Sequence, residues 1–191
     1  MKIGLFFGSF NPIHTGHLII ANHIVENTEL NELWFVVSPH SPFKEKKTLA
    51  SDYDRLHLVN ISIENNPNLR SSNIEFTLPK PSYTVDTLIF LREKFPMHEF
   101  TLIMGGDNLK SLHKWKNAAF LAKEYPIIVY KRPGEPVTLP PLEDLKVSFA
   151  EGPLLNISAS FIRKQIKAKR SIKYLVPDPV FDYLQNNPIY D

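Results

Sequence analysis

The chain has 191 residues and a formal net charge of +2, from 22 Lys and Arg against 20 Asp and Glu, and it contains no cysteine. This length suits one domain, and the absence of cysteine excludes disulfides, thiolate metal sites and cysteine nucleophiles. The near-neutral charge argues against a dedicated nucleic-acid binder. No signal-peptide core and no stretch of roughly 20 apolar residues is present, so we expect a soluble cytoplasmic protein without membrane contact.

Apolar runs that end at or near glycine, serine or proline alternate along the chain with segments of helical spacing. We expect buried strands at 3–7, 33–37, 100–104 and 127–130, and amphipathic helices at 17–26, 52–64 and 84–95. Continuous apolar strands separated by such helices are typical of a parallel sheet with both faces covered. The sequence therefore predicts an α/β fold built on a doubly wound parallel sheet.

The last third of the chain has a different pattern. Residues 133–143 are rich in proline and predict an irregular connection. A helix is expected over 158–169, with Ser158 as its N-cap, and a second over 177–187, with Pro179 near its first turn. We interpret this small helical C-terminal extension, about 157–188, as part of a single domain covering 1–191.

The loop after the first strand, residues 8–17, combines glycines with two histidines at the start of a helix. Glycine lets backbone N–H groups approach a ligand, and a helix N-terminus attracts phosphate. His14 and His17, three residues apart on one face, can hold triphosphate oxygens and stabilise charge that develops at the α-phosphorus. A zinc site is the alternative, but no third ligand is evident nearby, so we predict no protein-held metal.

The segment G-S-F-N-P-I-H-T-G-H at 8–17 resembles the G-x-F-x-P-x-H-x-G-H signature of the HIGH-motif nucleotidyltransferase superfamily. Residues 157–163, I-S-A-S-F-I-R, are similar to the superfamily's I-S-S-T-x-I-R element, from which Ala159 departs. The resemblance implies a Rossmann-like fold and the catalytic residues His14, His17 and Arg163. The implied ATP-binding residues are Gly8, Ser9, Phe10, His14, Gly16, His17, Gly105, Asp107, Ile157, Ser158, Ser160 and Arg163.

Two middle segments are similar to those of bacterial nicotinate-nucleotide adenylyltransferases. They are P-S-Y-T-V-D-T-L at 81–88 and G-G-D-N-L-K-S-L-H-K-W-K at 105–116. The resemblance implies that Trp115 stacks on the pyridine ring of nicotinate mononucleotide. It also implies that backbone N–H groups around Tyr83 and Thr84, and around Lys116 and Asn117, bind the nicotinate carboxylate.

Three basic residues follow strands or open a helix near the same edge of the expected sheet. The resemblance implies that Lys44 lies near the phosphates, although adjacent Lys46 and Lys47 leave the register open. It implies that Arg132, in a K-R-x-G-like element, holds the mononucleotide phosphate. We expect Arg55 to order the loop that contains Lys44.

The implied reaction is adenylyl transfer from ATP to nicotinate mononucleotide, which gives deamido-NAD and pyrophosphate in NAD biosynthesis. We expect Mg²⁺ to arrive with ATP. Nicotinamide mononucleotide, phosphopantetheine and a cytidylyl transfer are alternatives within the same class. A non-catalytic nucleotide-binding or RNA-binding regulator is the alternative from another class. Whether the chain forms a homo-oligomer is left open.

Overall fold

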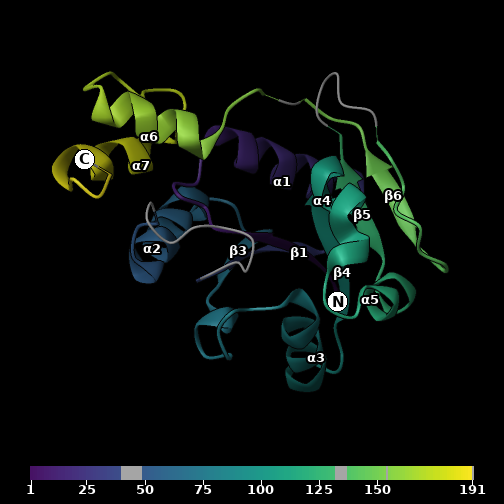
Figure 1. The fold of residues 1–191 in the computed structure, drawn as a ribbon. Helices are drawn as coiled ribbons and strands as arrows, with labels where there is room; N and C mark the ends of the chain where they lie inside the picture. The colour runs from purple at the N-terminus through teal and green to yellow at the C-terminus, as the bar shows by residue number, and fades with distance from the viewer. Residues whose placement is uncertain (40–48, 132–136, 154, 191) are drawn as a thin grey trace.

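The computed structural model describes residues 1–39, 49–131, 137–153 and 155–190, and in this part of the chain six parallel strands form one sheet. The strands are β1 (Lys2–Gly8), β2 (Glu32–Val37), β3 (Leu69–Ser72), β4 (Glu99–Gly105), β5 (Ile127–Tyr130) and β6 (Val147–Ala150). Their order is β3-β2-β1-β4-β5-β6, so the chain first builds outward from β1 in one direction and then in the other (Figure 1). This confirms the predicted doubly wound parallel sheet.

Helices cover both faces of the sheet. They are α1 (Thr15–Asn27), α2 (Asp52–Ile63), α3 (Thr84–Lys94), α4 (Gly106–Ser111), α5 (Ala118–Glu124), α6 (Ala159–Lys167) and α7 (Asp178–Asn186), with 3-10 turns η2 (Ile74–Phe76) and η3 (Leu112–Lys114). Buried side chains of α1, α2, α6 and α7 form one core, and those of α3, η3 and α5 form the other. Figure 1 shows α1 above β1 and α3 below it.

The structure confirms the four predicted strands and adds two edge strands that the sequence pattern did not indicate. β3 reads Leu-Arg-Ser-Ser and buries only Leu69, and β6 reads Val-Ser-Phe-Ala without a fully buried residue. An edge strand has a neighbour on one side and needs no continuous apolar run, so both escape a search for such runs. The short helices α4 and α5 were also not predicted.

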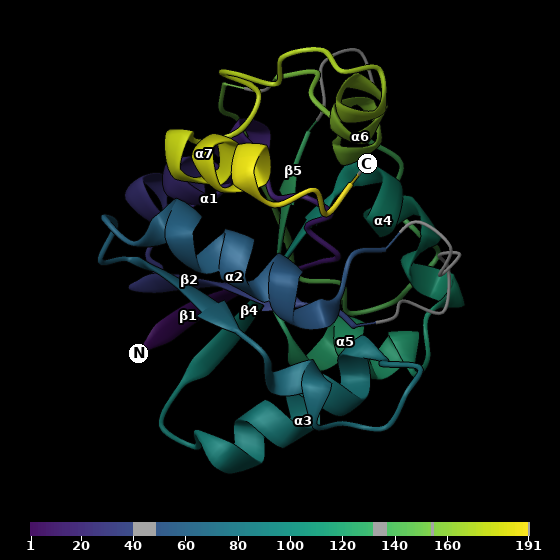
Figure 2. The same ribbon diagram turned by 90° about the vertical axis from the view of Figure 1, so that its left-hand side faces the viewer.

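The C-terminal extension packs back onto the amino-terminal half of the chain. Ser158 caps α6 as predicted, and its Oγ accepts the backbone N–H of Phe161 at 3.2 Å. Ile162 of α6 and Val180 of α7 are fully buried in the same core as Leu58 of α2. Figure 2 places α6 and α7 on one side of α2 and α3 on the other (Figure 2). This shared core supports the interpretation of the chain as one domain.

The sheet order determines where a ligand can bind. β1 lies between β2 and β4, and the direction of the winding reverses between β1 and β4. In open α/β sheets, ligands bind beyond the carboxyl ends of the strands at this reversal. Here those ends are Gly8 of β1 and Gly105 of β4, which begin two of the segments singled out in the sequence. Among the described residues, none of the helices combines the length and the apolar character that crossing a membrane requires.

We predict that Leu88→Ala lowers the free energy of unfolding by about 2–5 kcal/mol, the usual cost of a cavity in a packed core. Leu88 has no exposed surface and belongs to the core formed by α3, η3 and α5. Urea denaturation measures the change. Leu139→Ala is the matched control because Leu139 is 59% exposed, and an equal loss in both variants would contradict the assignment of this core.

Candidate active site

The loop after β1 is shaped by a buried aromatic ring. Phe10 is 2% exposed and has a φ of 43°, a left-handed conformation that non-glycine residues rarely adopt. A Cβ on Gly8 would lie 2.7 Å from the Phe10 ring, so glycine is required there. The ring packs edge-on against His17, with ring centroids 5.2 Å apart. Phe10 therefore supports His17 from the core side, and its ring does not face the open side of the loop.

The two histidines of the loop lie together, as predicted. The rings of His14 and His17 are stacked with centroids 3.6 Å apart and planes inclined by 20°. The backbone N–H of His14 donates to Nδ1 of His17 at 3.3 Å. Because Nδ1 accepts this bond, a neutral His17 carries its proton on Nε2 and can donate it to a ligand oxygen. The helix N-terminus at His14 adds partial positive charge at the same place.

The second motif lies against the first, although about 150 residues separate them. Nη1 of Arg163 donates to the backbone carbonyl of Asn11 at 2.6 Å. A Cβ on Gly16 would lie 3.9 Å from the Cβ of Ile157, so the start of α1 and the segment before α6 are in contact. The hydroxyls of Ser158 and Ser160 are exposed and 3.1 Å apart. The fold thus brings the two sequence motifs to one place.

Arg55 connects this loop to the one that follows β2. Its guanidinium is fully buried and donates to the carbonyl oxygens of Ser9 at 2.6 Å and Ser38 at 2.9 Å. Nη2 pairs with Asp52 at 2.6 Å, and Nε donates to the carbonyl of Ala50 at 3.1 Å. Arg55 thus binds backbone oxygens on both sides of 40–48, and the expectation that it orders the loop with Lys44 concerns residues outside the described part of the chain.

Asn11 and Tyr190 complete the packing around the two arginines. Oδ1 of Asn11 accepts the backbone N–H of Ala50 at 3.0 Å, a role that an aspartate oxygen could also fill. Burial raises the pKa of Tyr190, and the charges of Arg55 and Arg163 act in the opposite direction. Both arginines are therefore close enough to this C-terminal tyrosine to influence it.

The end of β4 lies next to the loop after β1, at the point where the strand order changes direction. Gly105 ends the strand and begins α4, where a Cβ would lie 2.6 Å from Oδ1 of Asp107 and 3.2 Å from the Tyr130 ring. Glycine therefore allows the close turn between strand and helix. Asp107, an ATP-binding residue implied by the resemblance, lies exposed in the first turn of α4 at the carboxyl edge of the sheet.

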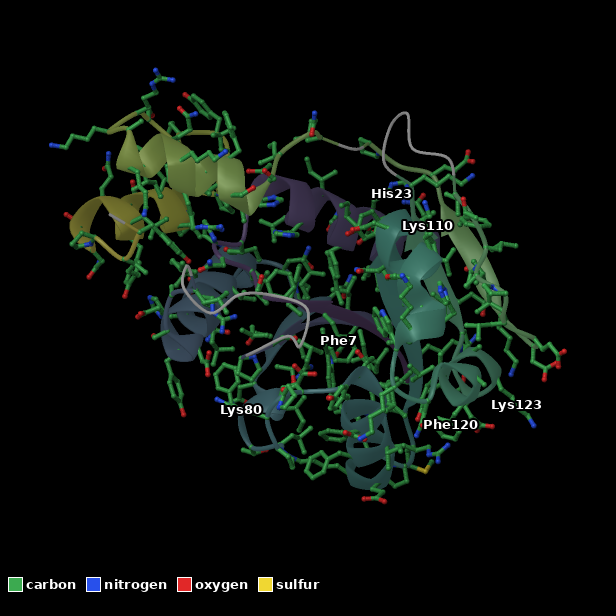
Figure 3. The ribbon with its side chains drawn as sticks, in the orientation of Figure 1. Phe7, His23, Lys80, Lys110, Phe120 and Lys123 are labelled. Carbon is green, nitrogen blue, oxygen red and sulfur yellow. The ribbon has the colours of Figure 1, made fainter. Side chains whose placement is uncertain are left out.

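A cavity of about 380 Å³ opens beside this reversal. Its walls come from the end of β1, the start of α3 and the segment after η3, and include Phe7, Tyr83, Thr84, Trp115 and Lys116. Figure 3 shows Phe7 between the sheet and α3 (Figure 3). Trp115 is half-buried. The cavity is therefore lined by residues of both middle segments, 81–88 and 105–116, which the sequence alone did not place together.

The N-terminus of α3 forms one wall of the cavity. Tyr83 is its N-cap, and the first bonds inside the helix run from the N–H groups of Asp86 and Thr87 to the Tyr83 carbonyl. The amides of Thr84 and the next residue precede these donors and have no acceptor inside the helix, which favours an anion. Nζ of Lys116 pairs with Asp86 at 2.8 Å and lies 4.8 Å from the centre of the Tyr83 ring.

The cavity also contains residues that the sequence analysis did not select, above all Glu75, Ser82 and Ser38. Glu75 is 1% exposed, and its Oε1 accepts the hydroxyl of Thr87 at 2.8 Å. Burial raises the pKa of Glu75, and the Ser38 and Thr87 hydroxyls partly oppose this. The available signal was a lone carboxylate between Ile74 and Phe76, shortly before the segment at 81–88.

Some predicted residues lie outside the described part of the chain. These are Lys44, with its neighbours Lys46 and Lys47, and Arg132. In the ranges that the structure describes, no three His, Cys, Asp or Glu side chains gather as metal ligands would. The expectation that Mg²⁺ arrives with ATP stays a prediction.

The sequence is similar to a known protein family and to several nicotinate-nucleotide adenylyltransferases. The family model described as cytidylyltransferase-like matches residues 5–165. A probable nicotinate-nucleotide adenylyltransferase of Flavobacterium psychrophilum is 50% identical over 191 residues, covering 100% of this chain and 99% of that protein. The nicotinate-nucleotide adenylyltransferase of Bacillus subtilis is 33% identical over 190 residues, covering 100% and 98%.

A solved structure has the same fold. It is the Plasmodium falciparum nicotinic acid mononucleotide adenylyltransferase complexed with NaAD, with a TM-score of 0.81 and 21% identity. The match covers 100% of this chain and 97% of that one. At this identity the likeness concerns the fold, and it confirms the predicted Rossmann-like architecture.

We predict that Glu75→Gln stabilises the protein increasingly as the pH rises above about 4, the range where a free glutamate begins to ionise. Because the pKa of Glu75 is raised in the folded state, the folded protein holds this proton more tightly than the unfolded chain. The contribution of protonated Glu75 to the free energy of unfolding is therefore fully present at low pH and is lost as the pH rises through the folded-state pKa of Glu75. Glutamine does not ionise, so the variant does not lose this contribution.

Urea denaturation at several pH values tests this expectation. Glu64→Gln, which makes the same change at an exposed residue just after α2, isolates the effect of burial. A difference between wild type and Glu75→Gln that does not grow with pH would contradict the prediction.

Proposed function

This chain belongs to the cytidylyltransferase-like family of nucleotidyltransferases, and we infer that it has nicotinate-nucleotide adenylyltransferase activity in NAD biosynthesis. The phosphate oxygen of nicotinate mononucleotide attacks the α-phosphorus of ATP. The bond from the α-phosphorus to the bridging oxygen breaks, and pyrophosphate leaves. The products are deamido-NAD and pyrophosphate. The observation that carries this assignment is the contact between Arg163 and Asn11, which joins the two nucleotide motifs beside the aromatic cavity.

ATP occupies the crevice at the carboxyl ends of β1 and β4 in this proposal. The loop at 8–17 receives the triphosphate, and Ser158 and Ser160 offer hydroxyls from the start of α6. Arg163 directs one donor to the loop backbone, which leaves further N–H groups of its guanidinium for the β- and γ-phosphates. Gly105 and Asp107 contact the nucleoside part from the end of β4.

Nicotinate mononucleotide occupies the cavity next to it. The pyridine ring stacks on half-buried Trp115, and the carboxylate accepts backbone N–H groups at the start of α3 beside Thr84. Tyr83 and Lys116 enclose this end of the cavity. Lys44 and Arg132 remain the predicted ligands of the phosphates.

Catalysis needs positioning and charge stabilisation and no covalent intermediate. His17 donates its Nε2 proton toward an α-phosphate oxygen, because the His14 N–H occupies Nδ1. His14 stacks behind it and holds the ring in place. ATP enters as its magnesium complex, which is a substrate and not a resident group of the protein.

The function is tested by pyrophosphate release from MgATP with nicotinate mononucleotide, nicotinamide mononucleotide and phosphopantetheine supplied separately. We expect the highest kcat/KM with nicotinate mononucleotide. A higher value with either other acceptor would favour that alternative. No release with any acceptor would favour the non-catalytic regulator. The cytoplasmic location stays a prediction, and the oligomeric state stays open.

His17→Ala should lower kcat by about a hundredfold or more, the usual loss when a donor to transition-state charge is removed. His23→Ala is the matched control, because His23 lies on α1 as well but outside the proposed site. Circular dichroism and thermal melting check that both variants fold. Near-normal turnover of folded His17→Ala would contradict the role of His17.

Trp115→Ala should raise the KM for the mononucleotide by about tenfold, since ring stacking on a cationic pyridine contributes about 1–2 kcal/mol. The KM for ATP should change little, because the triphosphate lies at the other part of the site. Trp115→Phe keeps an aromatic face and should recover most of the affinity. Equal increases in both KM values would indicate a general structural role instead.

A further inference from the structure

Glu75 places a buried carboxyl group in the wall of the acceptor cavity. The residue is 1% exposed and lies on η2, beneath the start of α3. The hydroxyls of Thr87 and Ser38 both act on this carboxyl group, Thr87 through a bond to Oε1, while Oε2 has no hydrogen-bond partner among the described residues. Ser82 lines the same cavity and is 8% exposed. Its Oγ is a second buried oxygen that has no hydrogen-bond partner among the described residues. Buried polar atoms without partners are rare and call for an explanation.

The group that would face these oxygens is the substituent on the pyridine ring. In the proposed function, on which this inference rests, that substituent lies at the start of α3 beside Thr84. Thr87, the partner of Glu75, belongs to the same first part of α3. We propose that Glu75 is a positioning residue that decides the preference of this cavity between a pyridine carboxylate and the corresponding carboxamide.

The protonation state of Glu75 gives this preference its physical basis. An uncharged carboxyl leaves the positive end of α3 free to attract the substrate carboxylate. An ionised Glu75 would place a second negative charge in the same poorly hydrated wall and repel that carboxylate. A carboxamide carries no charge, and its NH₂ group can donate to an ionised carboxyl. Burial raises the pKa of Glu75 and therefore extends the pH range in which the acid is preferred.

Other charged groups face this cavity and must be separated from Glu75 by the experiment. Tyr83 and Asp86 come from the start of α3, and Lys114 and Lys116 come from the end of η3 and the residues after it. The end of β1 contributes no titratable side chain, and Arg55 reaches the Ser38 carbonyl on the β2 side. A Glu75→Gln variant keeps all of these groups, so any pH dependence that they cause appears in both proteins.

The experiment measures kcat/KM for nicotinate mononucleotide and for its amide with wild type and Glu75→Gln, from about pH 4, where a free glutamate begins to ionise, to about pH 9. The ratio of the two values cancels the ionisation of the phosphate, which both substrates share. In wild type the acid-to-amide ratio should fall with rising pH, by about tenfold once Glu75 ionises, which corresponds to about 1.4 kcal/mol. In Glu75→Gln the ratio should be independent of pH.

A second variant separates charge from local structure. Thr87→Val removes the hydroxyl that binds Oε1 but leaves the Glu75 carboxyl in place. Thr87→Val should change kcat/KM for both mononucleotides by the same factor, so the acid-to-amide ratio should still fall with rising pH. Binding of each mononucleotide without ATP, followed by calorimetry, gives a measurement that does not depend on turnover and should show the same pattern.

Two results would overturn the inference. One is an acid-to-amide ratio that does not change with pH in wild type, and the other is an equal slope in wild type and Glu75→Gln. Failure of the proposed function looks different, because wild type would then form no dinucleotide from either mononucleotide at any pH.

Discussion

One buried cation holds together the segments from which the candidate active site is built. Arg55 is fully buried, and its guanidinium binds the carbonyl oxygens of Ser9 and Ser38, which follow β1 and β2. A charge removed from water is costly unless it is paired and its donors are satisfied. Asp52 and the carbonyl oxygens meet both conditions. The backbone at Ser9 and at Ser38 is therefore held together, since separating these two positions would leave the charge of Arg55 buried without its partners.

Arg163 applies a similar constraint from the other end of the chain. It binds the carbonyl of Asn11, two residues after the Ser9 carbonyl that Arg55 binds. Tyr190 lies within reach of both guanidinium charges, and the C-terminal helices share their core with α1 and α2. The nucleotide loop is thus held from two directions by arginines that satisfy its backbone oxygens. The C-terminal extension that carries the motif at 157–163 thus also stabilises the loop at 8–17.

The two halves of the site differ in their physical character. The proposed triphosphate side presents stacked imidazoles, a helix N-terminus and a guanidinium, all suited to several negative charges. The proposed acceptor side is a cavity lined by aromatic rings and by many uncharged polar side chains, with Lys116 already paired to Asp86. Glu75 brings a buried carboxyl group to this wall, where the scarcity of water leaves its charge poorly screened.

The sequence by itself determined the central strands, the principal helices and the two nucleotide motifs, because continuous apolar runs and helix-start signals are local patterns. It also indicated that His14 and His17 share one face, since their spacing places them in the same helical turn. Only the tertiary structure decided that Arg163 meets Asn11 and that Glu75 joins Trp115 in one cavity. The edge strands β3 and β6 and the buried state of Glu75 escaped local patterns for the same reason. Each depends on which neighbours the sheet order brings together, and that order is a property of the whole folded chain.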